Sequence, residues 1–228
     1  MGIIELTAKN TFLNLPEDKR ARIVAVAVCE FAANGYQKAS LNSMVKDLGI
    51  AKGSLYQYFA HKEALFLYVF ECFTRLVRQT VKDVVAESGE LDFFGQARQV
   101  VRAGTRFIDT WPDYFQIYQK VIFEQDIPRR DLLLSQVRLF SVEYFAPLCV
   151  AAQKSGLVRR DVPVNLIIFM VDAVIERFLQ AYAKAGLNDE TEPVGKSKKE
   201  LAGEIDTVID LLRDGIGRGL PPFSCSSI

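Results

Sequence analysis

The sequence contains few of the residues that usually build metal sites, disulfide frameworks or catalytic centres. There is one histidine, His61, and there are four cysteines in 228 residues. The cysteines stand far apart and form no C-x-x-C pair, which favours reduced thiols over a disulfide framework or a metal site. We therefore expect neither a metal nor a cofactor; the cysteines are Cys29, Cys72, Cys149 and Cys225.

The short signatures of common enzyme classes are absent as well. The chain has no G-x-S-x-G nucleophile motif and no G-x-x-x-x-G-K phosphate loop. Gly215, Gly217 and Gly219 have a spacing like that of a dinucleotide loop, but they end a helical pattern and follow no strand. His61 is better explained as a residue at a helix start than as a catalyst. We therefore expect that the protein is not an enzyme.

Long apolar runs and targeting signals are also missing. No run reaches the roughly 18 residues that a helix needs to span a bilayer. The start of the chain lacks the basic and apolar regions of a signal peptide. Apolar residues make up 50% of the chain and charged residues 25%, which indicates a soluble globular protein. We expect a cytoplasmic protein that does not bind a membrane.

The apolar residues follow a helical spacing along most of the chain, and the alternation typical of strands is almost missing. We therefore predict an all-α fold of about nine helices. Residues 1–15 are expected to form a mobile arm, residues 16–62 a compact three-helix head, and residues 63–228 a helical body. Within the body, a polar loop is expected over residues 186–195, which are rich in Asn, Asp and Glu.

A short capped helix is predicted to begin after Ser40. Its apolar residues fall at positions i, i+3, i+4 and i+7, namely Leu41, Met44, Val45 and Leu48. Ser40 can cap the start of this helix, and Gly49 suits the left-handed residue that ends one. A second helix is expected to begin almost at once, near Lys52, so the stretch predicts two short helices joined by a tight turn.

The outer face of this second helix carries an unusual set of side chains. Leu55 and Phe59 are expected to face inward. The remaining residues offer hydroxyls, an amide, a glycine and a lysine, which can hydrogen-bond phosphates or base edges without adding negative charge. In helix-turn-helix proteins the second helix enters the major groove of DNA. The pattern therefore predicts a DNA-reading helix.

The run KASLNSMVKDLGIAKGSLYQYFAHKEALF resembles the TetR family of bacterial transcriptional regulators, and GIAKGSLYQYFAHKEALF is its most specific part. The close match covers residues 23–66. The resemblance implies a helix-turn-helix head that binds double-stranded DNA, a ligand pocket in the body, and a homodimer formed through the last two helices. A two-fold dimer fits a palindromic operator, with its recognition helices about 34–36 Å apart.

Eight residues are the expected DNA contacts. Gln57 and Ser54 are candidates for base edges, since glutamine can form two hydrogen bonds with adenine. Gly53 leaves room for a backbone N–H to approach a phosphate. Phosphate contacts are expected from Ser40, Lys52, Tyr56, Tyr58 and Lys62.

Two positions depart from the family pattern. Ala51 stands where the family usually has Ser or Thr, which removes a helix cap worth about 1 kcal/mol and one phosphate contact. His61 stands where Ser, Asn or Asp is common. The alternative is therefore a helical ligand-binding protein whose head has lost specific DNA binding.

Charge is distributed unevenly, although the net charge is zero. Between Pro16 and Lys62 there are seven basic and four acidic residues, so the head is slightly basic and the body is correspondingly acidic. A basic head suits a protein that touches DNA at one end. Ordinary fluctuation within a short window would produce a similar excess.

Aromatic residues are dense in the first part of the body. For each of them, packing in the core is the alternative to lining a pocket that takes a hydrophobic or aromatic effector. The candidate lining residues are Phe107, Trp111, Tyr114, Tyr118, Phe140 and Tyr144.

Two carboxylates interrupt an otherwise apolar helix. Asp172 and Glu176 lie one helical turn apart, and unpaired burial of either would be costly. They could face a ligand cavity, pair with an arginine such as Arg102, Arg106 or Arg177, meet a partner subunit, or form a solvated stripe.

These features predict a ligand-responsive regulator. We expect it to act as a repressor, and we expect a small, mostly hydrophobic effector to release it from its operator. The hypothesis is a population shift in which the ligand favours a body conformation that tilts the heads out of register. The last helix carries an apolar stripe for the dimer or for packing within one chain: Leu201, Ile205, Val208, Ile209 and Leu212.

Overall fold

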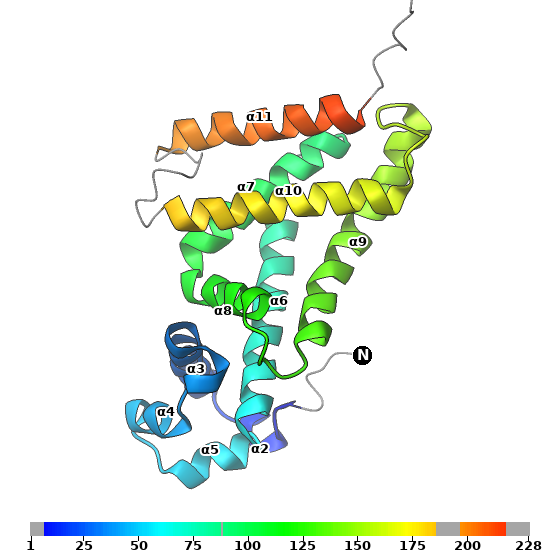
Figure 1. Ribbon diagram of the computed structural model, residues 1–228. Coiled ribbons are helices and arrows are strands. Elements are labelled where there is room, and N and C mark those ends of the chain that lie inside the picture. Colours follow the sequence, from blue (N-terminus) through cyan, green and yellow to red (C-terminus); the bar gives the residue numbers. More distant parts are fainter. Residues whose placement is uncertain (1–6, 88, 186–196, 218–228) are drawn as a thin grey trace, which may run out of the picture. The chain divides into compact units, whose positions relative to one another are not determined.

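The computed structural model describes residues 7–87, 89–185 and 197–217 (Figure 1). Within these ranges the chain forms helices and two isolated β-bridges, without a strand. The helices are α2 (Asn10–Leu13), α3 (Glu17–Lys38), α4 (Leu41–Leu48), α5 (Lys52–Tyr58), α6 (Lys62–Ala86), α7 (Phe93–Thr110), α8 (Pro112–Phe123), α9 (Arg130–Ser155), α10 (Val164–Ala185) and α11 (Lys198–Ile216).

The predicted all-α fold is confirmed. The additional helix is α2, which lies in the segment expected to be a mobile arm. Three expectations fall outside the described residues: the first six residues of the arm, the polar loop over residues 186–195, and Cys225.

The chain divides into two compact units. The first comprises Met1–Arg78 and Asp109–Val137, and the second comprises Gln79–Ile108 and Arg138–Ile228. The first unit therefore holds the expected head together with most of α6, the whole of α8 and the start of α9. Three helices, α6, α7 and α9, contribute residues to both units.

The head has its own apolar core because each of its helices carries one apolar stripe. Ile23, Ala27 and Phe31 of α3 are buried, and Phe31 has no exposed surface. The stripe predicted for α4 is buried at Met44, Val45 and Leu48, which confirms its orientation. Each such side chain stabilises the fold by about 1.5–3 kcal/mol relative to an exposed position. The head residues are thus held by burial rather than by helix propensity.

Residues 7–15 are packed against the head, so the expectation of a mobile arm is wrong for them. Phe12 is fully buried, and its ring centre lies 4.7 Å from that of Phe59 and 5.2 Å from that of Tyr68. The Lys9 N–H donates to the carbonyl of Tyr58 at 2.9 Å, and its Nζ donates to the carbonyl of Tyr56 at 2.8 Å. The arm is ordered because Phe12 fills the space beneath α5.

The second unit is built around α7, α9, α10 and α11. Seven of its side chains have no exposed surface, which makes a continuous core between the four helices. They are Phe94, Ala97, Val101, Cys149, Ile167, Val171 and Ile209.

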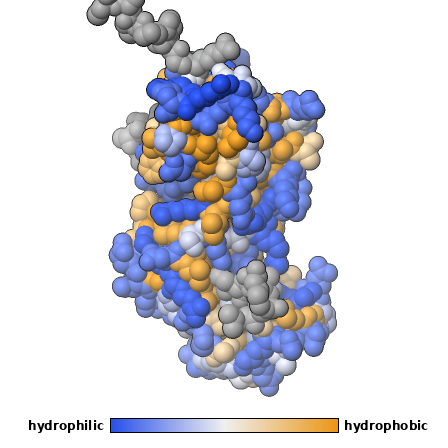
Figure 2. All heavy atoms as spheres, turned by 90° about the vertical axis from the view of Figure 1, so that its right-hand side faces the viewer, coloured by the Kyte–Doolittle hydropathy of each residue, from blue (hydrophilic) through white to orange (hydrophobic). Residues whose placement is uncertain are grey.

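Helix α9 exposes apolar side chains along one side. Leu139, Val142 and Val150 are 54%, 47% and 39% exposed. Figure 2, which views the side on which α9 is drawn in Figure 1, shows hydrophobic residues gathered on this face. By length and composition, α9 is the one helix among the described residues that could cross a membrane. It carries Arg138 and Glu143 near its middle, and such charges are costly within a bilayer.

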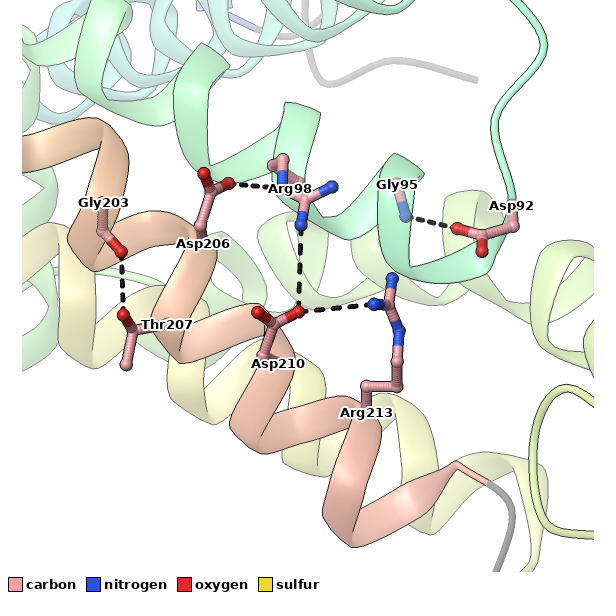
Figure 3. Close-up of polar contacts among 8 residues, drawn as sticks. All are labelled: Asp92, Gly95, Arg98, Gly203, Asp206, Thr207, Asp210 and Arg213. Atoms are coloured by element: carbon pink, nitrogen blue, oxygen red, sulfur yellow. Dashed lines mark hydrogen bonds and ion pairs between the residues drawn. The ribbon is translucent and has the colours of Figure 1, made fainter. Parts of the chain in front are cut away.

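Polar contacts hold α11 against α7 (Figure 3). The Arg98 Nε lies 2.7 Å from an Asp206 carboxylate oxygen, and its Nη2 lies 4.0 Å from Asp210. Arg213 approaches Asp210 at 3.3 Å and stacks its guanidinium 5.2 Å from the centre of the Phe94 ring. A capping box at Ser197 and Glu200 defines the start of α11. These charges join α11 to α7 in addition to its buried side chains Ile205, Ile209 and Leu212.

Candidate nucleic-acid interface

Helices α4 and α5 form the helix-turn-helix that the sequence predicts. The Ser40 Oγ accepts a hydrogen bond from the Ser43 N–H at 3.4 Å, so Ser40 caps α4 as expected. Gly49 ends the helix with φ 67° and ψ 31°, the left-handed conformation that glycine adopts without strain. The Ile50 N–H then returns to the Val45 carbonyl at 3.1 Å. This short connection brings α5 next to α4.

Two contacts join α4 to α3. The Ser40 N–H donates to Glu30 Oε1 at 2.8 Å, and the Arg22 guanidinium donates to the carbonyl of Leu48 at 3.2 Å. The first contact holds the start of α4 and the second holds its end. Helix α4 is therefore joined to α3 at both of its ends.

The outer face of α5 is exposed and free of carboxylates. Lys52, Gly53, Tyr56 and Gln57 are exposed, with Tyr56 at 40%, and Ser54 is half-buried. Leu55 is buried at 2% exposure and anchors the opposite face of the helix. The side chain of Ala51 makes no capping hydrogen bond, so the first N–H groups of α5 are left without a side-chain acceptor. Free N–H groups at a helix start favour an anion.

Two of the eight expected DNA contacts take part in internal packing. Tyr58 is buried, with 8% exposure, and its ring centre lies 6.1 Å from that of Phe12. The Nζ of Lys62 donates to the carbonyls of Gln37 at 3.1 Å and Ala39 at 3.2 Å. Tyr58 and Lys62 therefore contribute to the packing of α5 and α6 within the head. Ser40 is half-buried and its hydroxyl already caps α4.

His61 takes the role of a helix cap. Its Nδ1 accepts a hydrogen bond from the Ala64 N–H at 3.1 Å. This is the bond that a Ser, Asn or Asp side chain makes at the same place. The unusual residue therefore preserves the start of α6.

The expected effector residues are divided between the two units. Trp111, Tyr114 and Tyr118 belong to the first unit, and the remaining five belong to the second. The second group is Phe107, Phe140, Tyr144, Asp172 and Glu176.

In the second unit the candidate residues make packing contacts and hydrogen bonds within that unit. Phe107 is buried. The Tyr144 hydroxyl donates to Gln96 at 2.7 Å, and its ring lies 6.1 Å from that of Phe140. Asp172 accepts a hydrogen bond from the Ser141 hydroxyl at 2.7 Å.

Glu176 accepts a hydrogen bond from Gln180 at 3.4 Å, one helical turn further along α10. Both acids of α10 are half-buried and hydrogen-bonded. Their hydrogen bonds to Ser141 and Gln180 offset the cost of burying them. Ser141 and Gln180 are therefore among the partners of these two carboxylates.

A cleft of about 820 Å³ opens in the first unit, between α3, α6 and the start of α8. Trp111, 41% exposed, and Tyr114, buried, line it. Tyr118 lies in the same unit, but its ring stacks on Phe73 with 5.2 Å between the centres. Of the six aromatic candidates, the structure thus brings Trp111 and Tyr114 to one cavity.

The other residues of the cleft were missed by sequence reasoning. They include Arg20 and Ala25 of α3 and Tyr68 and Arg75 of α6. Apolar residues on α3 outside its core stripe were the available signal, because Val24 and Ala25 leave this helix with a second apolar face. Which element faces that surface depends on tertiary packing.

The comparisons with known proteins agree with this geometry. The domain described as bacterial regulatory proteins, tetR family, matches residues 23–69, which span most of α3, all of α4 and α5, and the start of α6. The probable acrEF/envCD operon repressor of Escherichia coli (strain K12) is 21% identical over 165 residues, which are 71% of this chain and 74% of that protein.

Solved structures extend the similarity over nearly the whole chain. A TetR family transcriptional regulator from Chloroflexus aurantiacus J-10-FL is 27% identical with a TM-score of 0.68, covering 93% of this chain and 100% of that one. The regulator FadR from Bacillus subtilis in complex with stearoyl-CoA is 19% identical with a TM-score of 0.65, covering 86% and 98%. The domain match, the relatives and the fold together identify residues 23–69 as a DNA-binding domain of the tetR type and show that this chain is similar to tetR-family transcriptional regulators.

Proposed function

We propose that the protein represses transcription by binding a palindromic operator as a homodimer, and that a small, mostly hydrophobic effector releases it. The observation that carries the DNA-binding part is the outer face of α5, which is exposed, basic at its start and free of carboxylates. Gln57 and Ser54 would contact base edges, and Lys52, Tyr56 and the Gly53 N–H would contact phosphates.

The dimer would form through α10 and α11. Leu166, Phe169 and Met170 of α10 are 48%, 64% and 42% exposed, and Leu211 of α11 is 67% exposed. Large apolar side chains gathered on one surface are typical of protein interfaces. Asp206 and Asp210 of α11 face Arg98 of α7 (Figure 3), and Leu211, the residue after Asp210, remains exposed.

Two-fold pairing of this kind would present two α5 helices to the DNA. The recognition helices of such dimers enter successive major grooves about 34–36 Å apart. We therefore expect an inverted repeat whose half-sites are separated by one helical turn.

The hydrophobic effector is supported by the aromatic and aliphatic lining of the cleft in the first unit, and by a structural neighbour that binds stearoyl-CoA. Since regulators of this family work on chromosomal DNA, we place the protein in the cytoplasm. We assign it no catalytic role.

Fluorescence anisotropy of the purified protein on DNA from upstream of its own gene would test the proposal. Titrations at several salt concentrations would compare the native protein with Tyr56→Ala and Gln57→Ala. Lys82→Gln, an exposed position of α6 outside the head, serves as the control for a surface substitution away from α5. We expect sequence-specific binding that weakens with salt, is lost in the α5 variants and is kept in Lys82→Gln.

If that fragment is not bound, selection from random genomic fragments would locate an operator elsewhere. Failure of both experiments would overturn the proposal. The function would then be ligand binding with a head that no longer reads DNA, for which the uncapped start of α5 at Ala51 is the supporting observation.

A further inference from the structure

Helix α3 has two apolar faces. Ile23, Ala27 and Phe31 form the face that is buried in the core of the head. Val24 and Ala25 lie on another face, which lines the cleft against α6 and the start of α8. A helix usually exposes polar residues outside its core face. The second face of α3 therefore gives the cleft an apolar wall with small side chains that leave room for a ligand.

Polar groups gather in this cleft around the hydroxyl of Tyr68 on α6. The Arg75 Nη2 lies 3.2 Å from the Cys72 sulfur, and both residues line the cleft together with Tyr68. Burial and the nearby Cys72 raise the pKa of Tyr68, whereas the charges of Arg75 and Arg20 pull it down. Both guanidinium groups thus act on the same hydroxyl, one from α6 and one from α3.

Tyr114 adds a second phenol from α8. Burial, Cys72 and Tyr68 raise its pKa while Arg75 lowers it, and the net shift is upward, so its hydroxyl stays protonated and able to donate. Two guanidinium groups and two phenols therefore line one apolar cleft.

The pKa of the Glu71 carboxylate is raised by burial, and the charge of Arg75 lowers it against that rise. In the described ranges of the chain neither Arg20 nor Arg75 forms an ion pair; Arg20 donates to the Leu13 carbonyl at 3.4 Å. The cleft also contains Glu17 and Asp113, which lie in the first turns of α3 and α8. Asp113 lies 3.6 Å from the Cys29 thiol, which donates to it.

We propose that this cleft is an effector site for a small organic anion, such as a carboxylate, with an aromatic or aliphatic body. Arg75, Arg20 and Tyr68 would hold the anionic group, because guanidinium and phenol donors form strong hydrogen bonds with a carboxylate. Val24, Ala25 and Trp111 would contact the apolar body. The volume of about 820 Å³ lies within the usual range for such ligands.

The regulatory part of this inference rests on the proposed DNA binding. A ligand in the cleft touches α3 directly, and α3 is joined to both ends of α4 through Glu30 and Arg22. Displacing α3 would move α4, and α5 with it, so that the two recognition helices no longer match their half-sites.

Trp111 is the only tryptophan of the chain, so its fluorescence reports on the cleft alone. The probe is anilinonaphthalene sulfonate, an aromatic anion, compared with phenylnaphthylamine, which has the same rings without the sulfonate. We expect saturable quenching of Trp111 by the anion. In Arg75→Gln the dissociation constant of the anion should rise about tenfold, while that of the neutral probe changes less than about twofold.

A second variant fills the cleft without altering its charge. Ala25→Leu is compared with Ala33→Leu, an exposed position of the same helix that does not line the cleft. We expect Ala25→Leu to lose quenching by both probes and Ala33→Leu to keep it, with equal helical circular dichroism in the two variants. The proposed site would be contradicted if Arg75→Gln lost affinity for both probes equally. It would also be contradicted if Ala25→Leu and Ala33→Leu bound the probes equally.

The coupling is tested on the operator identified by anisotropy. Saturating anilinonaphthalene sulfonate should weaken operator binding at least about tenfold in Ala33→Leu and leave it unchanged in Ala25→Leu. Probe binding in the cleft with unaltered operator affinity would overturn the effector role. Because the quenching experiments use no DNA, they distinguish a failed cleft from a head that does not bind an operator.

Discussion

The ammonium of Lys62 lies 4.7 Å from the centre of the Tyr36 ring. The same ammonium donates to two carbonyl oxygens at the end of α3, so Lys62 ties the first residue of α6 to the helix that leads into the helix-turn-helix. A lysine at this place in the sequence is equally compatible with a phosphate contact. The structure shows that its charge is used inside the protein.

Replacing Lys62 should therefore affect stability more than electrostatic attraction to DNA. Lys62→Gln loses a cation–π contact and two charge-assisted hydrogen bonds, which we expect to cost about 1–2 kcal/mol in urea denaturation. The salt dependence of operator binding should stay as in the native protein. Lys52→Gln should show the opposite pattern, with native stability and a salt slope reduced by about 1 per subunit. A reduced salt dependence of operator binding in Lys62→Gln would show that this lysine contacts a phosphate.

The start of α5 has no side-chain cap, so a substitution there should raise both the stability of the protein and its affinity for the operator. Ala51→Ser supplies a hydroxyl to the free N–H groups of the first turn, and a cap of this kind is worth about 1 kcal/mol. We expect a higher melting temperature and tighter operator binding. Ala60→Ser, at an exposed position between α5 and α6, is the control for the added hydroxyl. Unchanged stability of Ala51→Ser would show that α5 gains nothing from a cap.

The arm should contribute strongly to the stability of the head. Phe12→Ala removes a fully buried ring that contacts Phe59 and Tyr68, and such truncations cost about 3–5 kcal/mol. Leu13→Ala, at a neighbouring position that is 38% exposed, should cost less than about 1 kcal/mol. Urea denaturation followed by circular dichroism compares the two. Similar losses for both variants would mean that residues 7–15 are not anchored through Phe12.

The reactivity of Cys29 should depend on Asp113. Partial burial and the charge of Asp113 raise the pKa of the thiol, so less thiolate is present near neutral pH than for an ordinary cysteine. Alkylation by iodoacetamide should be slow at pH 7 and accelerate as pH rises. Asp113→Asn lowers the thiol pKa and should speed alkylation at pH 7, as measured by peptide mass spectrometry. Asp18→Asn, exposed on α3, should leave the rate unchanged; an equal acceleration there would exclude a specific effect of Asp113.

The proposed dimer can be tested with two phenylalanines of equal exposure. Phe169 of α10 is 64% exposed and Phe123 of α8 is 63% exposed. Phe169→Glu places a charge within the proposed interface and should convert the dimer to a monomer, because an unpaired buried charge costs several kcal/mol. Phe123→Glu should remain dimeric. Sedimentation velocity separates the outcomes, and a dimeric Phe169→Glu would place the interface elsewhere.

Local features of the sequence were sufficient to predict the helix-turn-helix. The cap at Ser40, the left-handed Gly49 and the stripe from Leu41 to Leu48 each depend on residues within one or two helical turns. Helix starts in the body follow for the same reason, since the fixed φ of Pro112 suits the first turn of a helix and Ser197 caps α11 through bonds with Glu200. Such signals need no knowledge of distant contacts.

The side chains of the site were decided by contacts between residues far apart in the chain. Tyr58 and Gln57 are neighbours in sequence, but Phe12 covers only Tyr58 and leaves Gln57 exposed. The same holds for the cleft, which exists because the second face of α3 meets α6 and α8 at residues more than forty positions away. Periodicity showed by itself that these helices form and which stripe each one buries. Only the tertiary structure decided which polar side chains face solvent, because that depends on which helix covers the remaining faces.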